Sequence, residues 1–385
     1  MKIEGAKWLN DAAPVLAMLE NAGHSALGVG GCVRNTIFNV PVADVDIATD
    51  ALPETVQALA KAAGFRAVPT GIEHGTITVV HNGEPYEITT YRKDVETDGR
   101  RAVVAFSSDI LDDAKRRDFT FNALYVRANG EVIDPLGGLP DAKARRLRFI
   151  ENAFERIAED SLRILRYFRF YAHYCDPLNG PDIEAVAAIS ASLDGLDGLS
   201  AERVGAEMRK LLSAPDPSAA LALMAQTGVL AQVLPGADTR AIGPLTELET
   251  QEPRRWLRRL AALGGENPAK RWRLSKAEAK GLADIMAAMG YPSLVEAGYR
   301  LGEAAAIDAM LVQCASLGLP VDANVTKLIK AAAQQVFPLK APYVMDRIPP
   351  GKALGLELRR LEKLWIDSGF ELSAAALDKM VKPWG

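Results

Sequence analysis

Short apolar runs alternate with helical patterns over the first 150 residues of this chain. An apolar run between turn residues is typical of a buried strand, whereas apolar residues three or four positions apart are typical of an amphipathic helix. The Asn82-Gly83 pair between two such runs is the strongest hairpin signal in the chain. These patterns predict strands over 26–29, 42–48, 75–80, 86–91 and 130–134, helices over 33–38, 53–63 and 114–124, and a loop over 92–101.

Strand patterns almost vanish after about residue 150, where alanine- and leucine-rich helical segments interrupted by prolines continue to the end. A chain of 385 residues is too long for one compact core, so more than one domain is expected. The pattern predicts the α+β class, in which a small mixed sheet with helices precedes a long all-helical part.

Composition excludes several classes of protein. Apolar residues make up 49% and charged residues 24% of the chain, as in ordinary folded proteins. No apolar run is long enough for a transmembrane helix, and the segment 1–19 lacks the layout of a secretion signal. Cys32, Cys175 and Cys314 are far apart and odd in number, which favours neither a disulfide framework nor a metal site. A reducing cytoplasm is therefore expected.

A glycine pair followed by two aspartates carries the first chemical signal. Gly30-Gly31 lies between a predicted strand and a predicted helix, with Arg34 three residues further on, and this arrangement is suited to binding a triphosphate. Asp44 and Asp46, at i and i+2 of a strand, point to one face and can hold a divalent cation. Either motif alone is usually a turn or a cap, but together they favour metal-assisted nucleotidyl chemistry.

Three further residues extend this candidate site. Glu87 lies in the hairpin strand and would complete a three-carboxylate cluster if that strand neighbours the one with Asp46; otherwise it is a solvent-facing glutamate. Arg117 and Asn122, placed together on the predicted 114–124 helix, are candidates for nucleotide binding, because arginine binds phosphate oxygens in a bidentate manner. The alternative for Arg117 is a surface ion pair.

A predicted helix over 156–172 carries an apolar stripe on one side and charges on the other. Asp160 and Arg163 are neighbours at i and i+3, and Arg166 and Arg169 continue the row of arginines. A carboxylate accepts from an exocyclic amino group while a guanidinium donates to a ring nitrogen, so such a pair would admit cytosine and adenine and reject uracil and guanine. An intrahelical row of salt bridges is the open alternative.

A basic segment between Pro253 and Lys276 contains a single acid, Glu266, and two interleaved tryptophans. The formal net charge of −4 argues against a protein that coats nucleic acid, but this local excess favours contacts with RNA phosphates, with a solvated helix face as the alternative. The candidate RNA-binding residues are Arg254, Arg255, Arg258, Arg259, Arg271 and Arg273.

These residues stand in motifs that resemble those of the class II tRNA nucleotidyltransferases, the CCA-adding enzymes, and of the bacterial poly(A) polymerases. The C-terminal third matches only in its helical character and in a weak PPGKALGLELRRLE string. The matching motifs run in family order over about half of the chain: GGCVRN, DVDIAT, HGTITV, YEITTYR, RRDFTFNAL, DPLGGLPD, EDSLRILRYFRF and AERVGAEMRKLL.

The resemblance implies a polymerase-β-like catalytic head and a Mg²⁺-dependent reaction, in which the tRNA 3′-hydroxyl attacks the α-phosphate of CTP and then of ATP without a nucleic-acid template. It implies a nucleotidyltransferase head over 1–150, a base-recognising helical neck over 151–215, and a tRNA-binding helical body and tail over 216–385. Carried over by position, Asp44 and Asp46 would bind the metal.

The same resemblance assigns roles to the nucleotide-binding candidates. Gly31 and Arg34 would contact the triphosphate and sugar, and Arg117 the triphosphate. Asp160 and Arg163 would act as the protein template for the incoming base, with Arg166 and Arg169 as further contacts.

One departure and three alternatives remain. The family usually has aspartate where this chain has Asn35, which leaves open how Arg34 is held. A poly(A) polymerase is disfavoured because the HGTIT string lacks the basic character usual in that branch. An enzyme that adds only CC or only A stays possible, although the 92–101 segment speaks for full CCA addition. A non-catalytic tRNA-binding protein is disfavoured because both aspartates are present.

Overall fold

The computed structural model describes residues 1–98 and 101–382, and the chain divides into two compact units. The first comprises Met1–Gly236 with Arg271–Arg273, and the second comprises Ala237–Lys270 with Leu274–Gly385. Each unit is described by itself. The expected division into head, neck, and body with tail remains a prediction.

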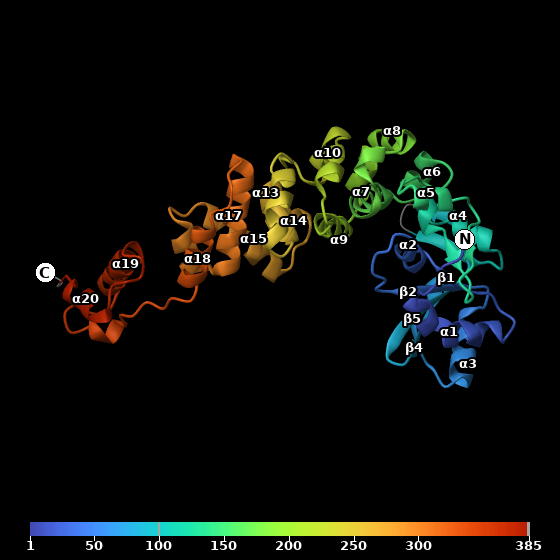
Figure 1. The fold of residues 1–385 in the computed structure, drawn as a ribbon, viewed down its shortest axis with the longest axis horizontal. Helices are drawn as coiled ribbons and strands as arrows, with labels where there is room; N and C mark the ends of the chain where they lie inside the picture. The colour runs from blue at the N-terminus through green and yellow to red at the C-terminus, as the bar shows by residue number, and fades with distance from the viewer. Residues whose placement is uncertain (99–100, 383–385) are drawn as a thin grey trace. The chain divides into compact units, whose positions relative to one another are not determined.

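A seven-stranded mixed sheet forms the centre of the N-terminal region, labelled in part in Figure 1. Its order is β3-β4-β5-β2-β1-β8-β9, and β2 and β5 are the parallel pair. The strands are β1 (Ala26–Val29), β2 (Val45–Thr49), β3 (Arg66–Gly71), β4 (Thr76–His81), β5 (Glu84–Thr90), β8 (Tyr125–Val126) and β9 (Val132–Ile133).

The Asn82-Gly83 hairpin is confirmed. Both residues have positive φ, 52° and 84°, as a two-residue turn with the twist of the flanking strands requires. The strands β4 and β5 pair antiparallel on either side of it. The predicted helices at 33–38 and 53–63 correspond to α2 (Gly31–Ile37) and α3 (Pro53–Ala62).

The two faces of the sheet are covered differently. On one face, a Cβ added to Gly28 would meet the Trp8 ring at 2.8 Å, so α1 (Lys7–Glu20) packs directly on β1 there. On the other face, Leu27, Val29 and Ala48 join a core with residues of the segment 114–125 and with Ile150. Because Asp46 and Ala48 alternate with Ile47, the carboxylate of Asp46 lies on this second face.

Three predicted elements are wrong. The segment 92–101 is not a loop: β6 (Arg92–Asp98) pairs with β7 (Arg101–Phe106) in a separate two-stranded sheet, although residues 99–100 lie outside the described part. The helix predicted over 114–124 is a short α4 (Ile110–Lys115) followed by a 3₁₀ turn, η2 (Thr120–Asn122). The helix predicted over 156–172 is two helices.

The break between these two helices has a local cause. Asp160 has extended backbone angles, φ −155° and ψ 104°, and its Oδ1 accepts a hydrogen bond from the backbone N–H of Leu162. A carboxylate that accepts from a helix N-terminal N–H starts a new helix. The result is α6 (Ala153–Glu159) followed by α7 (Leu162–Tyr174).

The rest of the first unit is helical, as expected. Its remaining elements are α5 (Leu139–Lys143), α8 (Ile183–Ala191), α9 (Ala201–Leu212), α10 (Ser218–Gln226) and α11 (Val229–Val233), with 3₁₀ turns η1 (Ile72–His74), η3 (Pro177–Asn179) and η4 (Leu193–Gly198). The predicted α+β fold class is confirmed.

The second unit is also helical in its described part. Its helices are α12 (Ile242–Leu248), α13 (Trp256–Leu263), α14 (Pro268–Arg271, the last residue belonging to the first unit), α15 (Lys276–Met289), α16 (Leu294–Leu301), α17 (Glu303–Leu317), α18 (Ala323–Ala332), α19 (Lys352–Asp367) and α20 (Ala374–Lys379), with 3₁₀ turns η5 (Glu249–Gln251) and η6 (Ala341–Tyr343).

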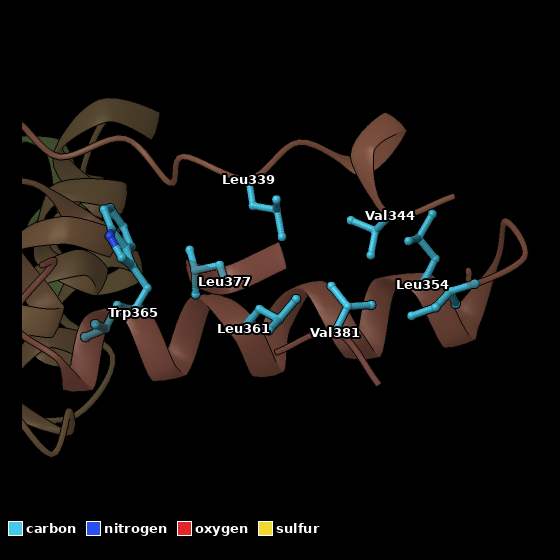
Figure 2. Packing of buried hydrophobic residues seen from close by; sticks show 9 residues of the cluster. Leu339, Val344, Leu354, Leu361, Trp365, Leu377 and Val381 are labelled. Carbon is cyan, nitrogen blue, oxygen red and sulfur yellow. The ribbon is translucent and has the colours of Figure 1, made fainter. Parts of the chain in front are cut away.

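The C-terminal helices have a core of their own. In Figure 2, Leu354, Leu361 and Trp365 lie along α19, and they belong to one buried cluster with Leu339, Val344 and Leu377. Burial of these apolar side chains stabilises the C-terminal helices. Over residues 1–98 and 101–382, no helix combines the length and apolar character needed to cross a membrane.

Candidate active site

The turn between β1 and α2 brings the glycine pair against an arginine. Gly30 has φ 69° and ψ −114°, a conformation that L side chains rarely adopt. A Cβ on Gly30 would lie 3.0 Å from Nη1 of Arg117, so a side chain here would also collide with that guanidinium. Glycine therefore allows the backbone and Arg117 to approach each other closely.

The carboxylates are brought together by strand register. Asp46 of β2 pairs with Glu87 of the parallel strand β5, so both side chains project from the same face. Burial raises the pKa of Asp46, and the negative charges of Glu87 and Asp44 raise it further, while Arg117 opposes them. Asp44 is exposed, lies just before β2, and lines a second cavity of about 490 Å³ instead of the pocket that Asp46 lines.

The predicted metal site is thus only partly assembled. Over residues 1–98 and 101–382, no three His, Cys, Asp or Glu side chains gather closely enough to hold a metal ion, so the three-carboxylate cluster with Glu87 is not formed. The donor set nevertheless fits Mg²⁺: the ligands are hard oxygens, and the raised pKa of Asp46 reflects burial first and then the negative charge of Glu87 and Asp44, which a divalent cation would offset.

One cavity of about 410 Å³ collects most of the nucleotide-binding candidates. Asp44, Glu87 and Arg169 do not line it. The residues that the sequence singled out and that line it are Gly30, Gly31, Arg34, Asp46, Arg117, Asn122, Asp160, Arg163 and Arg166. The lining residues to which sequence reasoning gave no role are Arg116, Asp118, Leu162, Phe170 and Arg203.

Arg117 is fixed by a buried carboxylate. Its Nε and Nη2 donate to Asp113 Oδ2 at 3.2 and 3.0 Å, and the Tyr125 hydroxyl donates to the same oxygen at 2.8 Å. Burial alone would lower the pKa of Arg117, but Asp113 and Tyr125 hold it above its ordinary value. The Nη1 side of the guanidinium is directed at the Gly30 turn.

A chain of hydrogen bonds connects the two ends of the pocket. Arg166 Nε donates to Asp118 Oδ2 at 2.7 Å, Asn122 Nδ2 donates to Asp118 Oδ1 at 2.9 Å, and Arg34 Nη1 donates to Asn122 Oδ1 at 2.6 Å. Burial would raise the pKa of Asp118, but Arg166 and these bonds lower it. Asn122 is therefore in the pocket, though in a 3₁₀ turn and not on a helix with Arg117.

Asp160 and Arg163 both line the pocket, but the predicted i, i+3 pair between them is wrong. Asp160 Oδ2 accepts from Arg203 Nη2 at 2.7 Å, and Arg163 pairs with Glu159 and donates to the Arg156 carbonyl at 2.7 Å. The extended backbone at Asp160 separates the two residues onto different elements. Each still has a polar group directed to one cavity.

Arg169 lies outside this cavity. It pairs with Glu207 at 3.1 Å and stands over the Phe170 ring at 4.5 Å. The predicted nucleotide contact of Arg169 therefore has no support in the pocket geometry.

Part of the predicted RNA-binding patch is wrong. Arg258 and Arg259 are 1% and 0% exposed and pair with Glu249, and Arg258 also pairs with Asp308 at 2.7 Å. Arg255 pairs with the same Asp308. Buried, paired guanidinium groups are not available to phosphates, because their carboxylate partners already neutralise them.

Of the six candidate arginines in the basic segment, Arg254, Arg271 and Arg273 are exposed, and their RNA contacts remain predictions. Arg273 forms an exposed pair with Glu202 at 3.3 Å.

Two of the missed residues had weak signals in the sequence. Ser200 caps α9, which places Arg203 in its first turn, but nothing in the spacing says that this turn faces Asp160. Asp118 follows the arginine pair directly, and only the tertiary fold pairs it with Arg166, 48 residues away.

Comparison with known proteins supports the same family. The poly(A) polymerase head domain model matches residues 27–148, and the model "Probable RNA and SrmB- binding site of polymerase A" matches 181–240. A CCA-adding enzyme of Streptococcus pyogenes is 45% identical over 206 residues, which cover 53% of this chain and 50% of that enzyme. The match thus spans about half the length of this relative.

Solved structures resemble the chain over most of its length. The Bacillus stearothermophilus CCA-adding enzyme in complex with CTP has a TM-score of 0.76 and 27% identity, covering 94% of this chain and 93% of that one. The Thermotoga maritima CCA-adding enzyme complexed with tRNA, at 17% identity and a TM-score of 0.71 over 98% of both chains, shows the shared fold. The resemblance seen in the motifs is confirmed, and residues 27–148 match the poly(A) polymerase head domain.

Proposed function

We propose that the protein is a tRNA nucleotidyltransferase that adds CCA to tRNA 3′ ends from CTP and ATP without a nucleic-acid template, releasing pyrophosphate. The observation that carries this proposal is that one cavity of about 410 Å³ gathers the groups that a nucleoside triphosphate requires. A nucleoside triphosphate needs cationic groups for its phosphates, a carboxylate for its metal and polar groups for its base. Arg34 and Arg117, Asp46, and Asp160 with Arg163 supply these three kinds of group in one place.

Base selection follows from the chemistry of Asp160 and Arg163. A carboxylate oxygen accepts from the exocyclic amino group of cytosine or adenine, and a guanidinium donates to the adjacent ring nitrogen. Uracil and guanine present a carbonyl and an N–H at these positions, so they leave buried groups unpaired. Arg203 supports this role because its bond to Asp160 Oδ2 fixes the carboxylate while a second lone pair stays available.

Asp44 and Asp46 would hold Mg²⁺, with Glu87 beside Asp46 in the sheet. The ion would supply activation of the 3′-hydroxyl and neutralisation of charge on the phosphates. Arg117, held by Asp113, would bind the triphosphate and keep its α-phosphate beside Asp46.

The proposed partners are tRNA, CTP and ATP, and the proposed compartment is the cytoplasm. The match to an RNA-binding model over 181–240 and the likeness to a tRNA-bound CCA-adding enzyme support the first. The family model is also shared with poly(A) polymerases, so the second candidate is an enzyme that makes oligo(A) tails.

A single assay separates these activities. The purified chain is incubated with tRNA that lacks 3′ residues, Mg²⁺ and labelled CTP, ATP or both, and the extended ends are sequenced. CCA addition that stops after three nucleotides supports the proposal. Long A tails support a poly(A) polymerase, CC or A alone supports a specialised enzyme, and no extension with tRNA binding retained supports a non-catalytic protein.

A further inference from the structure

Arg34 is a buried cation whose hydrogen-bond partners are neutral. The residue is 6% exposed. Its Nε and Nη2 donate to Asn35 Oδ1 at 3.1 and 2.8 Å, its Nη1 donates to Asn122 Oδ1 at 2.6 Å, and its Nη2 donates to the Tyr174 hydroxyl at 2.9 Å. Its guanidinium also lies 4.1 Å from the Tyr174 ring centroid. These contacts fix the group in position without cancelling its charge.

Other arginines around the same cavity are compensated. Arg117 pairs with Asp113, Arg166 with Asp118, and Arg203 with Asp160. Over residues 1–98 and 101–382, no carboxylate forms an ion pair with Arg34. Burial lowers the pKa of Arg34, although Tyr174 and Asp118 partly offset this, which agrees with a charge that lacks a full counter-charge. The nearby Asp118 carboxylate is already engaged by Arg166.

The orientation of the Asn35 amide is forced by its neighbours. Arg34 only donates hydrogen bonds and the Pro41 carbonyl only accepts them, so Asn35 must turn Oδ1 to Arg34 and donate from Nδ2 to Pro41 O, at 2.8 Å. An aspartate at this position would face Arg34 with a full negative charge and would lose the bond to Pro41.

We propose that Asn35 is a positioning residue that holds Arg34 in place while leaving its charge unneutralised, so that Arg34 forms a high-affinity site for a phosphate anion of the incoming nucleotide. The neutral contacts use four N–H groups of Arg34, and guanidinium has five. The remaining N–H and the uncompensated charge are what an anion entering the cavity meets. The inference rests on the proposed function only for the identity of the natural ligand.

The test measures binding of tripolyphosphate to the full chain by calorimetry, at low and at high salt, without tRNA. Asn35→Asp adds the missing counter-charge, so we expect its affinity at low salt to fall about 10-fold and its salt dependence to weaken. Asn35→Ala removes the same side chain and the bond to Pro41 but leaves the charge, and Asn122 and Tyr174 still hold Arg34, so its affinity should change by less than about 3-fold.

Thermal unfolding distinguishes an effect of the added charge on anion binding from a loss of folding stability. Because Asn35→Asp gives a buried cation a counter-ion, its unfolding midpoint should stay at or above that of Asn35→Ala while its anion affinity is lower. Equal loss of affinity in both variants, or an unchanged affinity in Asn35→Asp, would overturn the inference. If Asn35→Asp does not fold, Arg34→Gln is measured in its place. A loss of tripolyphosphate affinity smaller than about 3-fold in Arg34→Gln would also overturn the inference.

The two proposals can fail separately. A protein that binds tripolyphosphate with this pattern but does not extend tRNA would refute CCA addition and retain the anion site. If the protein extends tRNA but the Asn35→Asp and Asn35→Ala variants bind tripolyphosphate equally, the anion-site proposal is refuted and CCA addition is retained.

Discussion

Two segments of the chain are rich in arginine and aromatic residues, 156–170 and 254–259, and their side chains occupy different surroundings. In the first, Arg163 and Arg166 line a cavity, and they pair with Glu159 and Asp118, respectively. In the second, Arg258 and Arg259 are buried in the core of their own unit and pair with Glu249 and Asp308. The local sequences gave both segments the same interpretation, contact with a nucleic acid or nucleotide.

The difference lies in where the counter-charges come from. Asp308 stands 50 residues after Arg258 and is itself fully buried, so the pair closes inside the unit with no cavity left between the charges. In α7, Arg166 still lines the cavity although it is paired with Asp118. A run of positive residues therefore indicates a ligand site only where its carboxylate partners leave room for one.

The largest expected effect is on catalysis. Asp46→Ala removes a pocket carboxylate and should lower kcat for nucleotide addition by at least about 10³-fold, because the proposed Mg²⁺ would lose a ligand. Binding of tRNA, measured by filter retention, should stay nearly intact. Glu131→Ala, an exposed residue beside the same sheet, serves as the control and should keep its activity. Equal loss of tRNA binding and catalysis would contradict the metal role.

In the arginine core of the second unit, the expected effect is on stability. Asp308→Ala leaves Arg255 and Arg258 without their shared partner and should destabilise the fold by about 3–5 kcal/mol. The measurement is urea unfolding of the full chain. Asp238→Ala, which breaks an exposed pair with Arg240, should leave the midpoint nearly unchanged. A midpoint for Asp308→Ala as high as that of the control would show that the buried pairs are not needed.

The next effect is expected on base selectivity at the cavity that the arginines of the first segment line. Asp160→Ala should relax the exclusion of UTP relative to CTP by about 100-fold in kcat/KM, because the acceptor that rejects a carbonyl is gone. Asp182→Ala removes a carboxylate that caps α8, outside the pocket, and should keep the wild-type ratio. An unchanged CTP to UTP ratio in Asp160→Ala would refute its role as template.

A smaller effect is expected at the exposed end of the basic segment. Arg254→Ala should reduce the slope of log affinity for tRNA against log salt by about 0.7–0.9 if it contacts one phosphate. Arg240→Ala, an exposed arginine of the same unit that already pairs with Asp238, is the control. An unchanged slope for Arg254→Ala would remove the last member of the 254–259 set from RNA binding.

The smallest effect is the pH dependence of Asp46. Its pKa is raised above 3.8 by burial and by Glu87, so the folded state holds this proton more tightly than the unfolded chain. Its contribution to stability is therefore full below 3.8 and is lost as pH rises through the raised pKa, whereas catalysis needs the ionised form and gains over the same window. In Asp46→Asn, the urea unfolding midpoint should depend less on pH over this window than in the wild type. A profile as steep as wild type would assign the titration to another group.

Much of the fold followed from local patterns. The strand at 26–29, the Asn82-Gly83 hairpin and the helical second half were predictable because apolar period and turn chemistry act within a few residues. The break at Asp160 was not predictable from periodicity, since the apolar stripe continues across it. The strand β6 was missed because its polar composition is typical of a loop.

The residue types at the candidate site, and their order along the chain, were determined by the sequence alone, because glycine turns, paired aspartates and arginine motifs are local chemistry. Only the tertiary structure decided which arginines remain available to a ligand. That depends on carboxylates tens of residues away, Asp118 for Arg166 and Asp308 for Arg258, and on whether packing leaves space beside each pair. Long-range contacts of this kind have no period in the sequence from which they could be predicted.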